Sequence, residues 1–141
     1  MLRKLVLTAA VAAAVAGAAG AAGTGWASST LNVHAGQLSC AGAASWKHAG
    51  AFIGRVATLK GPVKSTEYAA YSNGSPTFLD IGRPYPHEGL AIVIWIENRP
   101  AFGRPEVKYR GHTICVRGTV HRYNGVPEII GRSPRQIRII R

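Results

Sequence analysis

The clearest pattern in this sequence is an alternating segment that leads into a tight turn and then returns. Apolar and polar residues alternate over residues 112–123, which is typical of a half-buried β-strand. An Asn-Gly pair at 124–125 predicts a two-residue hairpin turn, and residues 126–132 form the returning strand. This register places Val120 opposite Ile129 in the core. The chain is therefore expected to build an antiparallel sheet.

The same register brings charged residues together on the outer face of the hairpin. It places His121 opposite Glu128 and Arg117 opposite Arg132. Like charges directly across a ladder destabilise a sheet. Two explanations remain open: an anion lies between the arginines, or a twist or bulge near Gly131 separates them.

Three earlier segments also predict strands. The first, residues 55–65, alternates with a basic outer face, and a Gly-Pro pair at 61–62 suits a sharp bend. The second covers residues 76–82. The third, residues 90–96, is an apolar run whose length favours a central strand, with its bulkier residues, Ile96 included, facing the core.

Capping residues and helical spacing predict two short helices, within residues 45–54 and within residues 105–111. Three strands, a short helix and two strands then follow one another, which is the order of an OB fold with a bent first strand. The predicted fold class is all-β: a five-stranded OB-fold Greek-key barrel with a short helix between strands three and four and a short N-terminal helix.

The N-terminus has the three parts of an export signal: basic residues at 3 and 4, an uncharged run over residues 5–23, and small residues up to Ala27. Residues 1–27 are therefore expected to be a cleavable signal peptide. A retained membrane anchor is the alternative, although Ala and Gly lower the transfer energy of the run. Residues 28–44 are expected to form a flexible arm and residues 45–141 the domain. We expect a secreted protein, extracellular or in a periplasmic or cell-wall space, without stable membrane insertion after cleavage.

Charge and cysteine content bear on the partner and the compartment. Without residues 1–27 the chain keeps 15 Lys and Arg residues against 6 acids, a balance of +9. This excess favours an anionic partner, and a solvated basic face is the alternative. Cys40 and Cys115 allow a single disulfide, which is the expected state after export, although two free thiols are the alternative. The long closed loop makes such a bond worth about 4 kcal/mol in the chain-entropy model.

Several segments resemble a family of bacterial secreted OB-fold domains, similar to the nucleic-acid-binding modules attached to extracellular thermonuclease-like enzymes. They are GPV (61–63), PTFLDIGRPYP (76–86), VIW (93–95), YRGHTICVRG (109–118), YNGVPEI (123–129) and SPRQI (133–137). The resemblance covers about residues 45–140. Relatives often carry a cysteine in the first strand, where this chain has Leu59 or Lys60. The resemblance therefore implies that Cys115 pairs with Cys40, which places the arm against the fourth strand.

The candidate binding residues combine cations with aromatic rings, as single-strand binding by an OB fold requires. They are Lys60, Lys64, Phe78, Arg83, Trp95, Arg117 and Arg122. Phe78 and Trp95 fall on the non-core faces of neighbouring strands, so they are predicted to form a stacking platform. The alternative is that both rings pack beneath the arm, the linking helix or the loop over residues 65–75.

Catalysis is not expected from this sequence. The histidines are scattered, the carboxylates form no compact pair, and no metal-binding, nucleophile or phosphate-loop motif is present. No metal or cofactor is therefore expected. The predicted function is that of a secreted monomer that binds nucleic acid, single-stranded DNA or RNA, or another anionic polymer, with low sequence preference. The alternative is an exported interaction module that docks a protein or an acidic glycan.

Overall fold

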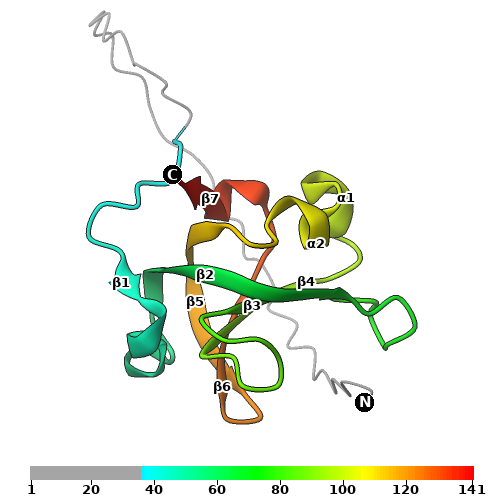
Figure 1. Ribbon diagram of the computed structural model, residues 1–141, viewed down its shortest axis with the longest axis horizontal. Helices are drawn as coiled ribbons and strands as arrows, with labels where there is room; N and C mark the ends of the chain where they lie inside the picture. Colours follow the sequence, from blue (N-terminus) through cyan, green and yellow to red (C-terminus); the bar gives the residue numbers. More distant parts are fainter. Residues whose placement is uncertain (1–35) are drawn as a thin grey trace, which may run out of the picture.

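The computed structural model describes residues 36–141 (Figure 1). The expected signal peptide, residues 1–27, and residues 28–35 of the expected arm lie outside the described residues. Within residues 36–141, no helix is long and apolar enough to cross a membrane.

The structure is rich in β-strands and contains few, short helices. The elements are β1 (Ala44–Ser45), the 3-10 helix η1 (Trp46–Phe52), β2 (Val56–Tyr68), β3 (Thr77–Ile81), β4 (Leu90–Ile94), α1 (Arg99–Phe102), α2 (Pro105–Lys108), β5 (Thr113–Tyr123), β6 (Val126–Ile130), the 3-10 helix η2 (Pro134–Gln136) and β7 (Ile137–Ile140). The five expected strands and both expected helical segments are therefore confirmed. The short strands β1 and β7 and the helices α1 and η2 were not predicted from the sequence.

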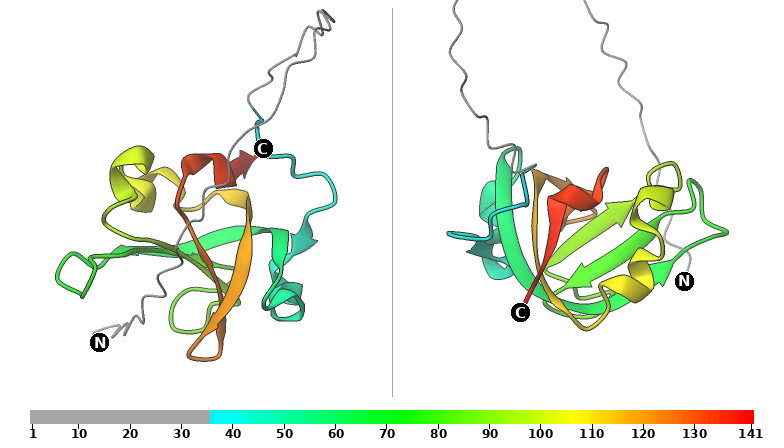
Figure 2. Two further views of the ribbon diagram at one scale, coloured as in Figure 1. Left: turned by 180° about the vertical axis from the view of Figure 1, so that it is seen from behind. Right: turned by 90° about the horizontal axis from the view of Figure 1, so that it is seen from above.

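Strand β2 has two partners along its length. It pairs antiparallel with β5 over Val56–Pro62 and with β3 over Val63–Tyr68, and the register shifts between Val63 and Ser65. The bend predicted at the Gly-Pro pair is thus accompanied by an irregularity just after it. In the right-hand view of Figure 2, β2 curves around one side of the molecule.

The mixed sheet has seven strands in the order β1-β2-β3-β4-β6-β5-β7. Because β2 also pairs with β5, the strands β2, β3, β4, β6 and β5 form a ring of pairings. Neighbours in this ring are antiparallel except β4 and β6, which are parallel. The arrangement resembles that of OB-fold proteins.

The core lies inside this ring and consists of the inward residues of the alternating strands. Val120 and Ile129 are directly opposite each other and fully buried, which confirms the predicted hairpin register. Leu90 and Ile94 also face this core, as expected. Ile96, in contrast, is 42% exposed. The prediction for Ile96 is wrong because β4 ends at Ile94 and the chain turns there.

The indole ring of Trp46 packs so closely against three glycines that none of them has room for a side chain. A Cβ atom added to Gly61, Gly82 or Gly89 would lie 2.5, 2.3 or 2.3 Å from the nearest ring atom of Trp46. The guanidinium of Arg83 lies over the same ring, 6.0 Å from its centroid. Arg83, a predicted binding residue, therefore lies beside this packing site.

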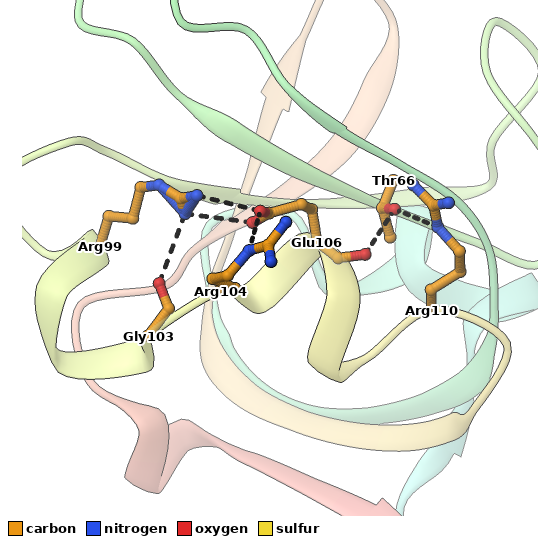
Figure 3. Close-up of polar contacts among 6 residues, drawn as sticks. All are labelled: Thr66, Arg99, Gly103, Arg104, Glu106 and Arg110. Atoms are coloured by element: carbon orange, nitrogen blue, oxygen red, sulfur yellow. Dashed lines mark hydrogen bonds and ion pairs between the residues drawn. The ribbon is translucent and has the colours of Figure 1, made fainter.

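A second structural contact attaches the α1–α2 segment to β2 (Figure 3). Arg99 donates to both carboxylate oxygens of Glu106 at 3.1 and 3.0 Å, and Arg104 approaches one of them at 3.7 Å. The Thr66 hydroxyl donates to the backbone carbonyl of Glu106 at 2.8 Å and accepts from Arg110 at 2.9 Å. These contacts give Arg99, Arg104 and Arg110 local partners within the protein.

The disulfide between Cys40 and Cys115 is present, as predicted. Cys115 lies on β5, opposite Lys60 of β2 and Arg138 of β7. Arg138 donates to the backbone carbonyl of Leu38 at 3.3 Å. Residues 38–40 of the expected arm are therefore held against β5 and β7, which is the placement implied by the family resemblance.

The packing of Trp46 on glycine leads to a stability prediction. We expect Gly89→Ala to lower the free energy of unfolding by about 1–3 kcal/mol, because the new methyl group overlaps the indole. The control is Gly50→Ala, where a Cβ meets no atom within 4 Å and φ is ordinary. Urea unfolding measures both. Equal unfolding midpoints for the two variants would contradict this packing.

Candidate functional site

The structure does not gather the seven predicted binding residues at one place. Phe78 is only 4% exposed, in a cluster with Ala69 and Val93. Its ring therefore has no accessible face for a base, so the predicted stacking platform does not include Phe78. Alternation assigned Phe78 correctly to the non-core face of β3, but the loop that begins at Ala69 covers that face.

Trp95 lies just beyond the end of β4 and is half-buried. One part of its ring packs on Gly74, where an added Cβ would lie 2.8 Å from the ring. Trp95, Tyr123 and Ile130 form the partly buried edge of the Phe78 cluster. The predicted alternative, in which the rings pack beneath the loop, thus describes Phe78 and part of Trp95.

The outer face of β3, β4 and β6 carries buried acids. Asp80, Ala91, Glu128 and His121 follow one another across four strands in register, and the predicted pairing of His121 with Glu128 is confirmed. Asp80 and Glu128 are 1% and 8% exposed. Burial raises the pKa of the Glu128 carboxyl above its ordinary value. OB folds commonly bind oligomers on this face, but here it is covered and acidic, which is unfavourable for a polyanion.

Cationic side chains gather instead around a cleft next to β5, which we call the arginine cleft. Its volume is about 540 Å³, and its lining includes Arg117, Arg132 and Arg135 together with His121. The arginines are exposed. Arg117 donates to the Thr58 hydroxyl at 3.2 Å. Within residues 36–141, no carboxylate forms an ion pair with these three arginines.

One amide side chain organises the backbone of this cleft. The Gln136 carbonyl oxygen accepts from the backbone N–H groups of Arg132 and Ser133 at 2.7 and 3.0 Å. Its amide nitrogen donates to the backbone carbonyls of Arg117 and Ile130 at 3.1 and 3.2 Å. Gln136 therefore connects β5, the end of β6 and the start of η2.

Sequence reasoning did not include Arg132 and Arg135 among the candidate residues, although a signal for their placement was present. Ser133 and Gln136 form a capping box, with Ser and Gln at the spacing that marks a helix start. The Ser133 hydroxyl accepts from the backbone N–H of Arg135 at 3.3 Å. Recognising this box would have predicted η2 and placed Arg135 in an ordered turn.

The predicted pairing of Arg117 with Arg132 across the hairpin is wrong. Arg117 is opposite Thr58 of β2, and the pairing of β5 with β6 extends only from Val120 to Tyr123. The chain leaves the ladder at Gly131, whose backbone N–H donates to the Val93 carbonyl at 2.8 Å. Both arginines nevertheless line the same cleft.

The other predicted cations lie away from the arginine cleft. Lys60 is exposed on the outer face of β2, in the strand next to Arg117. Lys64 and Arg122 are exposed and do not line the cleft. Among the described residues, no group of three or more His, Cys, Asp or Glu side chains is placed to hold a metal ion.

Comparisons with known proteins identify no family for this chain. No protein-family model matches the sequence, and no curated protein does so. A chain of the Stn1–Ten1 complex of S. pombe is similar in structure, with 16% identity and a TM-score of 0.45 over 61% of this chain and 58% of that one. The OBody AM1L10 bound to hen egg-white lysozyme is also similar, with 13% identity and a TM-score of 0.46 over 64% of this chain and 83% of that one. The chain therefore covers less than two thirds of the length of the first of these structures.

The burial of Glu128 leads to a pH prediction. Because its pKa is raised in the folded state, this carboxyl contributes stability that is present below its ordinary pKa of 4.5 and lost as pH rises through the folded value. We therefore expect Glu128→Gln to be more stable than the parent protein at neutral pH and to flatten the fall in stability above pH 4.5. Urea unfolding from pH 4 to 8 tests this, with exposed Glu97→Gln as the control. A parent-like pH profile in Glu128→Gln would contradict it.

Proposed function

We propose that this chain is a secreted, non-catalytic OB-fold barrel that binds single-stranded nucleic acid, with low sequence preference, in the arginine cleft. The ring of pairings from β2 through β3, β4, β6 and β5 supports the barrel assignment, together with the parallel pairing of β4 with β6. The disulfide is compatible with an oxidising compartment. The signal peptide stays a prediction from the sequence.

The observation that carries the proposal is the gathering of Arg117, Arg132 and Arg135 around one cleft without carboxylate partners among residues 36–141. A guanidinium group presents donors in a planar fork that matches two phosphate oxygens. Three such groups repel one another. A phosphate bound between them would attract each guanidinium group and so offset the repulsion. The cleft therefore favours phosphate-bearing ligands over neutral ones.

A strand with bases fits this surface better than an isolated anion. Ile130 lines the arginine cleft and also packs against the Phe78 cluster, as Trp95 and Tyr123 do. Ile130 therefore lies between the cleft and the partly buried edge of this cluster, which is beyond the buried acids Asp80 and Glu128 in the ladder. Phosphates would contact the arginines, while bases would reach this edge and stack on accessible ring surface. Stacking on a ring face is tolerant of base identity, so low sequence preference follows.

Binding can be tested with a charge-neutralising variant. We expect Arg132→Gln to weaken binding of a fluorescent 12-residue oligothymidylate and to reduce the slope of log K against log salt by about 0.7. Fluorescence anisotropy between 50 and 200 mM salt, the range over which phosphate contacts lose much of their affinity, measures both quantities. Lys64→Gln removes the same charge from an exposed residue outside the cleft and should bind as the parent protein does.

Two results would overturn the proposal. One is the absence of oligonucleotide binding at low salt, or an affinity that does not change with salt. The other is equal weakening by Arg132→Gln and Lys64→Gln, which would mean that net charge and not the cleft controls binding. Tighter binding of a sulfated glycan than of oligonucleotide at equal salt would favour the interaction-module alternative.

A further inference from the structure

A second, larger cleft lies on the other side of the N-terminal arm. Its volume is about 1110 Å³, and its basic lining residues are Lys108, His112, Arg138 and Arg141. None of its lining side chains is a carboxylate. Among residues 36–141, no acidic side chain forms an ion pair with Lys108 or Arg138. We call it the arm cleft.

The two clefts share the same two chain segments as walls. The arm contributes Gly36 and Leu38 to the arginine cleft and Gln37 and Ser39 to the arm cleft. The η2–β7 segment contributes residues 135–136 to the first, and Pro134 and residues 137–141 to the second. Figures 1 and 2 show the start of the described arm, in cyan, beside β7, in red.

The cations of the two clefts lie within reach of one short polymer. Arg135 and Arg138 are three residues apart, so their Cα atoms are separated by at most about 11 Å. Each carries a long side chain that extends this reach. A strand held at Arg135 therefore needs only a few nucleotides to place a phosphate beside Arg138.

The shared wall is fixed before any ligand arrives. Cys40 is bonded to Cys115, and Arg138 donates to the Leu38 carbonyl at 3.3 Å. A guanidinium group has five donors, so this contact leaves others for a phosphate. A wall that is already ordered reduces the entropy lost on binding.

We propose that the arm cleft is a second phosphate subsite for the same single strand, so that the preferred ligand is an extended strand that crosses the arm and occupies both clefts. This inference rests on the proposed function. Short strands bind in the arginine cleft, because Gln136 fixes the backbone that carries Arg117 and Arg132 and Arg135 lines the same cleft. Longer strands gain phosphate contacts in the arm cleft.

The experiment measures affinity against ligand length. Oligothymidylates of about 4 to 16 residues span the site sizes known for OB folds. For the parent protein we expect affinity and salt slope to rise with length and then reach a plateau. We expect Lys108→Gln combined with Arg141→Gln to bind the shortest strand normally and to lower the salt slope of the longest by about 1.4, the value for two lost phosphate contacts.

The matched control combines Lys47→Gln with Lys64→Gln, which removes two charges from exposed residues outside both clefts. Non-reducing mass measurement and urea unfolding verify that the disulfide and the fold are retained in each variant.

The outcomes separate this inference from the proposed function. A salt slope independent of strand length, or equal losses for short and long strands in the Lys108 and Arg141 double variant, would overturn the second subsite and leave the arginine cleft intact. Equal losses in the control would overturn it as well. Failure of every strand to bind the parent protein would overturn both proposals.

Discussion

The arrangement of this protein depends on one strand being shared between two partners. β2 leaves β5 after Pro62 and continues along β3 from Val63, with a register shift before Ser65. Because of this change of partner, β2, β3, β4, β6 and β5 close into a ring of pairings. Each alternating strand then has one face toward the enclosed apolar core and one outer face. The change of partner also places β5 between β2 and β7, which is where the disulfide, the arm and the cationic clefts are found.

Local hydrogen bonds are sufficient to hold the arginine cleft together. Two exposed unit charges 4 Å apart interact by only about 1 kcal/mol in water, and salt weakens this further. The Gln136 side chain makes four hydrogen bonds to backbone groups, and a typical one contributes about 0.5–1.5 kcal/mol. These hydrogen bonds fix the backbone that carries Arg117 and Arg132 and offset the electrostatic repulsion between the two guanidinium groups. A bound phosphate would remove that repulsion.

The sequence predicted what depends on short-range periodicity. Alternation and the Asn-Gly turn located the hairpin and its Val120–Ile129 pair, because a shift of one residue would expose the core face. Periodicity could not show what covers an outer face, so Phe78 was assigned to a ligand although a loop covers it. β7 is four residues long, too short for a convincing alternation, and the arginine cleft depends on contacts between Gln136 and the distant Arg117.

Two acidic side chains of the sheet's outer face are buried, whereas the arginines of the arginine cleft are exposed. Asp80 and Glu128 lie buried on the outer face of β3 and β6, whereas Arg117, Arg132 and Arg135 are exposed around the arginine cleft. His121 marks the boundary, because it is opposite Glu128 and also lines the arginine cleft. Exposed cations attract a phosphate backbone over about a Debye length, while buried acids contribute no contact surface. Burial therefore decides which outer side chains a ligand could contact, and the strand order alone does not decide it.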